Sequence, residues 1–508
     1  MKTIKLEKGL LKIYRKIVQD DFVAENIANG VSSKYRLSAK NLYRYLILRS
    51  YDLRKYQNSL SDLGISALRS AEGYVFSNLF HTIRLLKLNR GMIWDEKYGL
   101  EAIGYQKSKK ILAKHANELF NSRRKKHLTE IMVTLPTEAA DDIDLLRNLV
   151  KEGMEIARIN LSHDDFPIWE KMITNIRQIE AETDEKVKIY MDLAGPKIRT
   201  ADIEVKSKKG KSKDFIKIKE GDHINLTKKA TKGKKVIIAA DGSLLQEGEI
   251  GVLLPQIIDD VEVGDPIFFD DGMIRSIVLS KGSDSVKLLI TKAFKSKLKS
   301  GKGINLPNTQ LNLPSLTERD REVLPFVCTH ADIVGYSFVR TPQDVERLYS
   351  ELEKYNNKNL GVVLKIENKE AFENLARLLF AAMKRNKIGV MIARGDLAVE
   401  IGFERIAEVQ SQILWLCEAA HVPVIWATQV LENLAKTGIA TRAEVSDAAL
   451  SAQAECVMLN KGPYIVDAVK TLKEIISKME NHGYKKKNSM RILNIAKNTL
   501  EDREWERV

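Results

Sequence analysis

Eight short apolar runs, separated by segments with helical spacing, constrain the fold of this chain more than any other feature. Runs of β-prone residues that alternate with helical segments form parallel strands joined by crossover helices. Eight such units predict an α/β fold of the closed (β/α)₈ barrel type. We expect the strands at residues 131–135, 156–161, 187–193, 333–338, 362–366, 388–392, 424–427 and 456–459.

The remaining segments differ from the barrel pattern. Before the first run, apolar residues recur at helical spacing, and a basic run at residues 123–126 marks the end of this segment. Between the third and fourth runs, short alternating stretches and a hairpin signal at residues 282–285 predict an inserted β-domain. The predicted domains are a mostly helical domain (1–128), the barrel (129–200 and 301–480), a small inserted β-barrel domain (201–300) and a helical tail (481–508).

The net charge of +14 lies entirely in the first quarter of the chain. Residues 1–130 hold 26 Lys and Arg against 12 Asp and Glu, and the remainder is balanced. The basic residues are interspersed with apolar ones at helical spacing, which is typical of solvated helix faces. We therefore expect this domain to pack against the barrel or to mediate subunit contacts in a homo-oligomer, and not to bind nucleic acid.

The cysteines and the hydropathy of the chain indicate the cellular compartment of the protein. Cys328, Cys417 and Cys456 have no paired spacing and lie among apolar residues, so we expect buried, reduced thiols and a cytoplasmic location. The first residues lack the apolar stretch of a signal peptide, and no run of about 18 apolar residues occurs. The sequence therefore predicts no membrane segment.

Reactive side chains follow several of the predicted strands. Glu367 directly follows the run 362–366, and Asp396 comes shortly after the run 388–392. The carboxyl ends of the strands meet at one mouth of a (β/α)₈ barrel, so we expect these carboxylates to share a Mg²⁺ or Mn²⁺ ion. Lys365 is a cation within an otherwise apolar run and has no evident packing role.

Other strand-end residues have both a structural and a functional interpretation. Thr428 follows the run 424–427, and its hydroxyl either bonds to the backbone or contacts a substrate. Asp396 can cap the helix that follows it as well as bind a metal, with Gly395 providing the turn. Backbone N–H groups at such a helix start also suit an anionic substrate.

Several segments together resemble the pyruvate kinase family. They are residues 191–200 (Met-Asp-Leu-Ala-Gly-Pro-Lys-Ile-Arg-Thr), 365–368 (Lys-Ile-Glu-Asn), 393–397 (Ala-Arg-Gly-Asp-Leu), 426–432 (Trp-Ala-Thr-Gln-Val-Leu-Glu) and 441–447 (Thr-Arg-Ala-Glu-Val-Ser-Asp). Residues 157–163, 270–272, 302–307 and 337–340 are also similar to family motifs. The resemblance implies a kinase that transfers a phosphoryl group from phosphoenolpyruvate to ADP, giving pyruvate and ATP, with Mg²⁺ or Mn²⁺ as cofactor.

The resemblance also implies roles for single residues. The catalytic groups would be Lys365, Arg158 and Thr428, and the substrate-binding groups Gly395, Asp396, Thr428 and Lys365. Nucleotide and phosphate groups would meet Arg158, Asn160, His163, Arg199 and Lys302, although His163 can equally be a structural hydrogen-bonding group. The metal ligands would be Glu367 and Asp396, and the monovalent-cation region would comprise Asn160, Ser162, Asp192 and Lys197.

Three loops depart from the family pattern. Residues 192–197 read Asp-Leu-Ala-Gly-Pro-Lys where many members have Asp-Thr-Lys-Gly-Pro-Glu, which resembles the members that need no K⁺, because the Lys197 ammonium can supply the missing charge. Residues 134–136 (Thr-Leu-Pro) and the short loop 460–464 (Asn-Lys-Gly-Pro-Tyr) alter the expected nucleotide contacts. The sequence has no counterpart of the carboxy-terminal effector domain, so we expect no control by fructose bisphosphate there.

Two other functions fit part of this pattern. A metal-dependent aldolase or lyase that stabilises a pyruvate enolate would use the same pair of acids, although the inserted domain, Arg199 and Lys302 argue against it. A catalytically weakened relative, whose basic helical domain binds an acidic partner or nucleic acid, is the second alternative.

Overall fold

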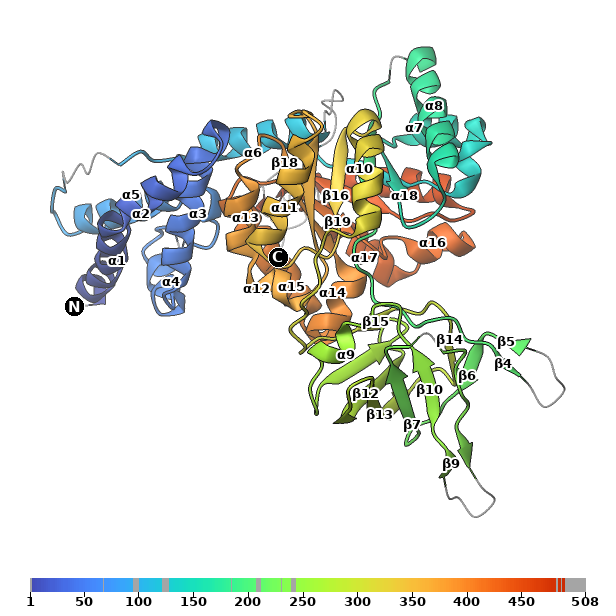
Figure 1. Ribbon diagram of the computed structural model, residues 1–508. Coiled ribbons are helices and arrows are strands. Elements are labelled where there is room, and N and C mark those ends of the chain that lie inside the picture. The colour runs from blue at the N-terminus through green and yellow to red at the C-terminus, as the bar shows by residue number, and fades with distance from the viewer. Residues whose placement is uncertain are drawn as a thin grey trace, which may run out of the picture. The chain divides into compact units, whose positions relative to one another are not determined.

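Eight parallel strands form a closed barrel in the computed structural model (Figure 1). The structure describes residues 2–66, 68–94, 100–120, 128–183, 185–206, 212–229, 231–238, 244–480, 483–485 and 487–488. In order around the barrel the strands are β1 (Glu130–Thr134), β2 (Ile156–Asn160), β3 (Lys188–Asp192), β16 (Ile333–Tyr336), β17 (Gly361–Ile366), β18 (Ile388–Ala393), β19 (Val424–Ala427) and β20 (Cys456–Leu459). Each strand coincides with one of the expected apolar runs, so the predicted fold class is confirmed.

Burial explains why these strands were legible in the sequence. Strands β17, β18, β19 and β20 are buried at every position, as expected for parallel strands covered on both faces. Strand β16 ends at Tyr336, two residues before the expected end, because Phe338 has a left-handed backbone with φ of +54°. The apolar pattern continues past the point where hydrogen bonding between strands stops.

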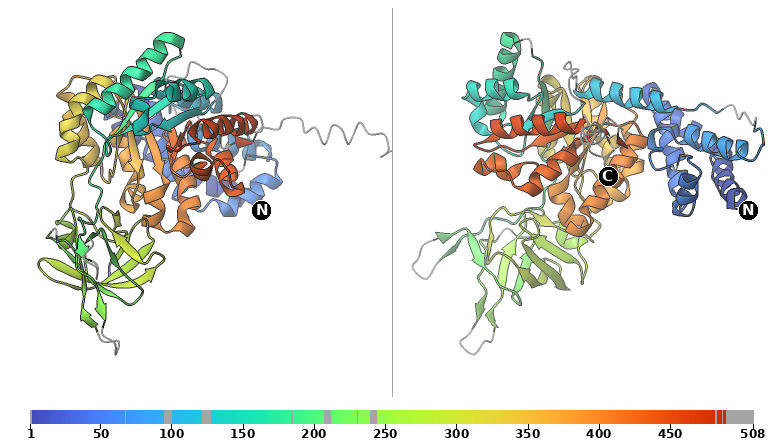
Figure 2. Two further views of the ribbon diagram at one scale, coloured as in Figure 1. Left: turned by 90° about the vertical axis from the view of Figure 1, so that its right-hand side faces the viewer. Right: turned by 180° about the vertical axis from the view of Figure 1, so that it is seen from behind.

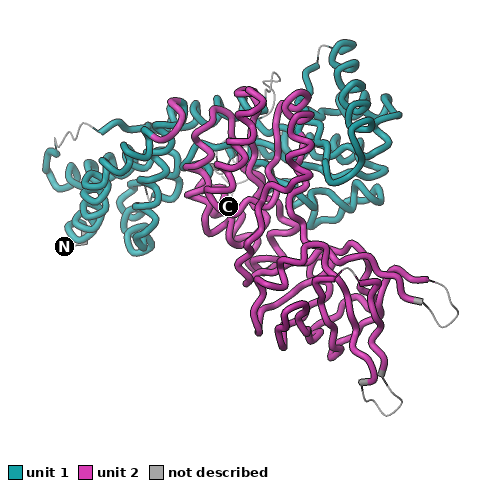
Figure 3. The backbone as a smooth tube through the Cα atoms, viewed as in Figure 1, with its two compact units in different colours: residues 1–29, 34–190, 417–508 teal, residues 30–33, 191–416 magenta. Residues whose placement is uncertain are grey.

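The chain divides into two compact units (Figure 3). Unit 1 comprises residues 1–29, 34–190 and 417–508, and unit 2 comprises residues 30–33 and 191–416. Strands of the barrel occur in both units, so this division does not follow the domain boundaries expected from the sequence, which stay predictions.

Unit 1 begins with the helical region expected from the sequence. Its helices are α1 (Lys2–Gln19), α2 (Asp21–Asn29), α3 (Arg36–Arg49), α4 (Arg54–Asp62), α5 (Val75–Leu88) and α6 (Tyr105–Phe120), with 3₁₀ turns η1 (Ser33–Tyr35) and η2 (Glu72–Tyr74). Helix α3 is buried on most of its surface, including the side chains of Lys40, Asn41 and Arg44. The basic run at residues 123–126 lies outside the described residues.

The barrel helices of unit 1 show clear start and stop signals. They are η3 (Thr137–Ala140), α7 (Ile143–Glu152), α8 (Phe166–Thr183), α16 (Glu432–Thr437), α17 (Arg442–Ser451) and α18 (Ile465–Glu480), followed by the short strands β21 (Gly483–Tyr484) and β22 (Lys487–Asn488). Asp142 caps the start of α7, and Gly153 ends it with φ of +125°. A capping box between Thr441 and Glu444 starts α17.

Unit 2 contains further barrel helices and a lobe rich in β-strands (Figure 2). The helices are α10 (Glu318–His330), α11 (Pro342–Glu353), α12 (Lys369–Glu373), α13 (Leu375–Ala382), α14 (Arg394–Ile401), η4 (Phe403–Arg405) and the start of α15 (Ile406–Ala419). The lobe comprises β4 (Val205–Lys206), β5 (Ser212–Lys213), β6 (Phe215–Lys217), β7 (His223–Thr227), β8 (Ile237–Ile238), β9 (Leu244–Gln246), β10 (Gly248–Gly251), α9 (Ile257–Asp260), β11 (Pro266–Phe269), β12 (Ile274–Lys281), β13 (Ser285–Ala293), β14 (Lys297–Lys299) and β15 (Ile304–Asn305).

The lobe has a core of its own. Six of its strands pair in the order β10-β7-β13-β12-β11-β15, around buried residues such as Ile224, Ile267 and Leu288. The expected hairpin at residues 282–285 is confirmed, because β12 and β13 are antiparallel and the Gly282 amide donates to the Ser285 carbonyl at 2.8 Å. No helix among the described residues is long and apolar enough to cross a bilayer. All three cysteines are buried and free, as expected.

Candidate active site

The Lys365 side chain joins two carboxylates at the ends of barrel strands. Its Nζ lies 2.9 Å from Asp192 Oδ2, 3.0 Å from Glu367 Oε1 and 2.7 Å from Ser337 Oγ. All four side chains are buried, and we call them the lysine cluster. Charges taken out of water are tolerated only when they are paired, so each member depends on the others.

A backbone amide also holds Glu367 in place. The Phe338 N–H donates to Glu367 Oε2 at 2.7 Å, and the Ser315 hydroxyl donates to the Phe338 carbonyl at 2.8 Å. Burial raises the pKa of Glu367, and the nearby Lys365 ammonium acts against this rise. Left-handed backbone at a bulky residue such as Phe338 is costly and gathers at functional sites.

Asp396 is paired with Lys197. Both carboxylate oxygens accept from the Lys197 ammonium, at 3.0 and 3.1 Å. Asp396 lies in the first turn of α14, whose N-cap residue is Ala393, so the interpretation of Asp396 as the helix cap is wrong. Gly395, which precedes it in the same turn, is part of the helix as well.

A glycine and an aspartate fix the loop that carries Lys197. Gly195 has φ of +63°, and a β-carbon there would lie 2.8 Å from a ring carbon of Phe338, so no larger residue fits. Asp320 Oδ1 accepts from the backbone amides of Ala194 and Gly195, at 3.0 and 3.3 Å. The Gly-Pro-Lys sequence therefore places an ammonium group beside Asp396.

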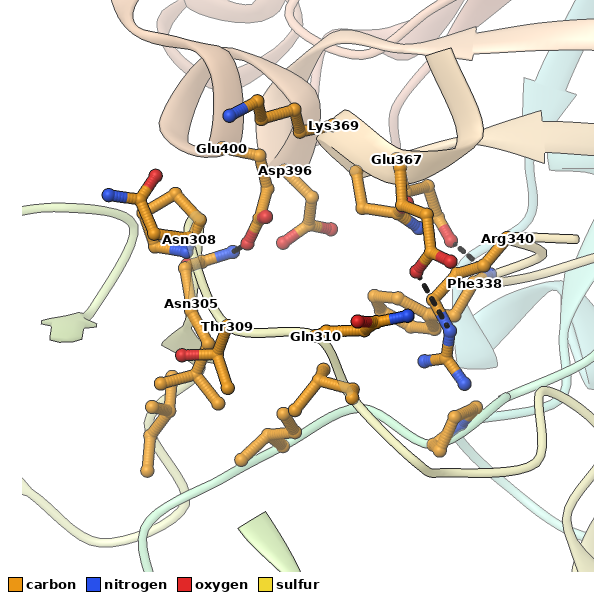
Figure 4. A pocket seen from close by; sticks show the side chains of 18 of the residues that line it. Asn305, Asn308, Thr309, Gln310, Phe338, Arg340, Glu367, Lys369, Asp396 and Glu400 are labelled. Atoms are coloured by element: carbon orange, nitrogen blue, oxygen red, sulfur yellow. Dashed lines mark hydrogen bonds and ion pairs between the residues drawn. The ribbon is translucent and has the colours of Figure 1, made fainter. Parts of the chain in front are cut away.

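Glu367 and Asp396 line a cavity of about 320 Å³ in unit 2 (Figure 4). The figure shows the carboxylates of Glu367, Asp396 and Glu400 on one wall and, on the other, the side chains of Asn305, Asn308, Thr309 and Gln310. Asn305 donates to Glu400 at 3.1 Å, and burial raises the pKa of Glu400 to about 7, with the charge of Asp396 adding to the rise. The cavity thus has one acidic wall.

The two carboxylates at this wall suit a bound divalent cation. Asp396 pairs with the Lys197 ammonium and Glu367 with the Lys365 ammonium, and both carboxylates line the cavity. Among the described residues, no group of three or more His, Cys, Asp or Glu side chains is arranged to hold a metal ion. Mg²⁺ characteristically uses one or two carboxylates and takes its other ligands from water and substrate oxygens. Glu367 and Asp396 suit such an ion, which would replace Lys197 as the partner of Asp396.

Three residues expected to bind phosphate share a cavity of about 280 Å³ in unit 1. Arg158, Asn160 and His163 line it, together with Lys436 and Lys461. Arg158 is buried and donates to Thr134 Oγ1 at 2.9 Å, which fixes its guanidinium group. A buried arginine with two exposed lysines nearby suits a phosphorylated ligand.

Two more expected phosphate-binding cations lie where the lobe joins its unit. Arg199 donates to the Gly301 carbonyl at 2.9 Å, and Lys302 Nζ lies 2.8 Å from Asp270 Oδ1. Burial acts to raise the pKa of Asp270, but hydrogen bonds from Lys295 and Lys302 outweigh it and lower the pKa. Neither Arg199 nor Lys302 lines the acidic-walled cavity.

Thr428 lies directly after β19 in a strained segment. Its φ is +65°, and Gln429 and Leu431 also have left-handed backbones, with φ of +56° and +46°. Ser162, expected near a monovalent cation, donates its amide to Asn160 Oδ1 at 3.1 Å but does not line the unit 1 cavity.

Sequence reasoning missed two features of the site. The pairing of Lys197 with Asp396 spans 199 positions, and the motif containing Lys197 suggested a monovalent-cation role instead. Glu400 was missed although it lies one helical turn after Asp396, a spacing that places two side chains on the same helix face. That spacing is the signal that could have found it.

Comparisons with known proteins agree with the resemblance seen in the sequence. The family model for the barrel domain of pyruvate kinase matches residues 126–469. The pyruvate kinase of Geobacillus stearothermophilus is 34% identical over 362 residues, covering 70% of this chain and 57% of that relative. The Thermotoga maritima enzyme is 32% identical over 359 residues, covering 69% of this chain and 71% of that relative. The chain thus spans little more than half of the first relative, and it belongs to the pyruvate kinase family.

Proposed function

We propose that this protein transfers the phosphoryl group of phosphoenolpyruvate to ADP, giving pyruvate and ATP. The observation that carries the proposal is the Lys365 ammonium, held between Asp192 and Glu367, the second of which lines one cavity with Asp396. An ammonium group fixed in a buried site stabilises developing negative charge far better than one in water. Family membership supports the same reaction.

Phosphoryl transfer requires mainly positioning and charge neutralisation. Lys365 would neutralise the oxygens of the transferring group, and Arg158, Asn160 and His163 would bind phosphate oxygens. Arg199 and Lys302 would add positive charge for the nucleotide. These roles agree with the burial of Lys365 and with the lining of the unit 1 cavity by Arg158, Asn160 and His163.

The substrate carboxylate and the enolate need separate partners. Gly395 and its neighbours offer backbone N–H groups at the start of α14, where an anion is favoured. The hydroxyl of Thr428 would guide the proton that completes pyruvate. Glu367 and Asp396 would hold Mg²⁺ or Mn²⁺, which supplies positive charge to the substrate and phosphoryl oxygens.

The proposed enzyme does not require K⁺. The family's monovalent-cation region corresponds to Asn160, Ser162, Asp192 and Lys197, and the last of these brings a positive charge. With Glu367 and Asp396 holding a divalent ion, the Lys197 ammonium would be available to the substrate phosphate. A homo-oligomer in the cytoplasm, with no contact to nucleic acid or membrane, belongs to the same proposal.

The test is pyruvate formation from phosphoenolpyruvate and ADP with Mg²⁺, measured with and without K⁺. Wild type is compared with Lys365→Met and with Lys384→Met, in which the lost lysine forms an exposed pair with Glu346. We expect turnover without K⁺ in wild type and in Lys384→Met, and a loss of at least about 10³-fold in Lys365→Met. A large rate gain from K⁺ would contradict the K⁺ proposal.

Absence of turnover in a folded wild type would contradict the kinase proposal itself. Binding of Mn²⁺, followed by its paramagnetic resonance signal, shows in that case whether the acidic wall still holds a metal. A protein that binds Mn²⁺ but forms no pyruvate would favour the aldolase or lyase alternative.

A further inference from the structure

The turn that leads into β19 contains a fully buried histidine with a strained backbone. His421 is 0% exposed and has φ of +49°. A residue with a β-carbon adopts this left-handed conformation at a cost, and it persists only where the surroundings hold it. The left-handed backbone of His421 must therefore be stabilised by its neighbours.

The helical region of unit 1 supplies the partners. His421 Nδ1 lies 3.1 Å from Ser38 Oγ, and Nε2 lies 2.9 Å from the Gly73 carbonyl and 3.1 Å from Ser108 Oγ. His115 Nδ1 lies 2.7 Å from the His421 carbonyl. Because a carbonyl can only accept, Nε2 of His421 and Nδ1 of His115 carry protons. We call these five residues the histidine cluster.

The histidine cluster is tightly packed around Gly73, and a second hydrogen bond from the helical region lies beside it. A β-carbon on Gly73 would lie 2.1 Å from Ser108 Oγ and 3.3 Å from His421 Nε2, so only glycine allows this approach. Asn41, on α3, donates to the Ala419 carbonyl at 2.8 Å. Side chains from α3 and α6, together with the Gly73 carbonyl, thus form hydrogen bonds with the turn at Ala419 and at His421.

Strand β19 connects this turn to Thr428. The strand has four residues, all buried, and pairs with β20 through Ile425 and Trp426. His421 before it and Thr428 after it both have left-handed backbones. A close-packed interior transmits strain, so a short buried strand cannot absorb a displacement at one end without moving the other.

We infer that the helical region is a positioning scaffold for β19, with His421 as the positioning residue. By fixing the entry to the strand, the histidine cluster sets the backbone conformation at Thr428 and the residues after it. The catalytic consequence rests on the proposed function, in which Thr428 serves the substrate. The coupling from His421 to Thr428 does not rest on it.

Hydrogen–deuterium exchange in the full chain tests this coupling without any assay of activity. The variants are Ser108→Ala, which removes one partner of His421, and His421→Gly, which removes the ring but tolerates the backbone. The matched control is Asn78→Ala, on α5; among the described residues the Asn78 Oδ1 atom accepts from the hydroxyls of Ser66 and Thr82, both in the helical region. Circular dichroism establishes that each variant is folded.

We expect amides of residues 424–431 to exchange about tenfold faster in Ser108→Ala and faster still in His421→Gly, with no change in Asn78→Ala. Pyruvate formation by Ser108→Ala should fall through kcat, while Mn²⁺ binding at Glu367 and Asp396 stays as in wild type. Faster exchange confined to residues 419–423, with residues 424–431 unchanged, would overturn the inference. If His421→Gly does not fold, Ser108→Ala still decides between these outcomes. If wild type forms no pyruvate, the exchange result stands and only the proposed function fails.

Discussion

The lysine cluster and the histidine cluster are both buried polar groups that join distant parts of the sequence, but they differ in charge. The first contains an ammonium group between two carboxylates, whereas the second is made of hydroxyl, imidazole and carbonyl groups, without a carboxylate, and burial lowers the pKa of its His115. Buried charges are costly and are kept only when fully paired, whereas neutral hydrogen bonds cost little to bury once satisfied. The comparison suggests that this fold uses charge where chemistry takes place and neutral groups where one element must hold another.

The largest effect on stability should come from breaking the lysine cluster. Lys365→Met leaves Asp192 and Glu367 buried without their common partner, and such losses typically cost about 3–5 kcal/mol. Chemical denaturation of wild type and variant measures the difference in the free energy of unfolding. Lys384→Met is the control, since exposed pairs contribute about 0–1 kcal/mol. Equal losses in the two variants would remove the distinction between paired burial and surface charge.

A smaller effect should follow from removing a neutral anchor. Asn41→Ala deprives the carbonyls of Glu72 and Ala419 of their donor and the Val75 amide of its acceptor. Each buried group left unsatisfied costs about 1–3 kcal/mol, although relaxation and entering water reduce the sum. We expect a loss near the lower end of that range for the whole variant, measured by denaturation beside Asn78→Ala. A loss of unfolding free energy larger than that of Lys365→Met would contradict the expectation that the buried charge pairs contribute more to stability than this neutral side chain.

The two clusters also differ in how far the sequence could predict them. The barrel strands were legible because parallel strands are apolar at every position, and Lys365, Glu367 and Asp396 were legible because they interrupt or follow such runs. Ser38, Asn41 and Ser108 interrupt nothing, since short polar residues are common among helical residues. Ser38 meets His421 across 383 positions, and only the tertiary fold brings them together. Side-chain pairing over such distances has no local signal.

The pair formed by Lys197 and Asp396 is more exposed than either cluster, and its loss should have a smaller effect than loss of the lysine cluster. Their side chains are 31% and 18% exposed, so solvent weakens the attraction without removing it. Lys197→Met removes a cation that competes with the divalent ion for Asp396. We expect Mn²⁺ to bind about tenfold more tightly, a difference of about 1.4 kcal/mol, as measured by titration calorimetry.

The control for this measurement is Lys228→Met, which removes a lysine paired with Asp259 in the lobe, away from the acidic wall. Its affinity for Mn²⁺ should equal that of wild type. Weaker binding in Lys197→Met would instead mean that the lysine organises the acidic wall for the metal. A charged lysine would then have the positioning role that we assign to the histidine cluster.

The smallest expected effect concerns pH and the histidine cluster. Burial lowers the pKa of His115 below its ordinary value of 6.5, and its hydrogen bond to the His421 carbonyl opposes the shift only in part. The folded state therefore binds fewer protons than the unfolded chain at mildly acidic pH. The stabilisation is complete above about pH 6.5 and is lost as the pH falls toward the lowered pKa of the folded state.

Unfolding free energies measured between pH 5 and pH 7.5 should accordingly fall with acidification, with a smaller slope in His115→Gln than in wild type. A single histidine contributes at most about 1.4 kcal/mol per pH unit, so the difference is modest. The matched variant is His81→Gln, on the exposed face of α5. Equal slopes in wild type and His115→Gln would mean that this imidazole has the same proton affinity in both states. Protonation of His115 would then leave the stability of the folded state unchanged, and the lack of charge on this imidazole would not be the property that suits the cluster to positioning.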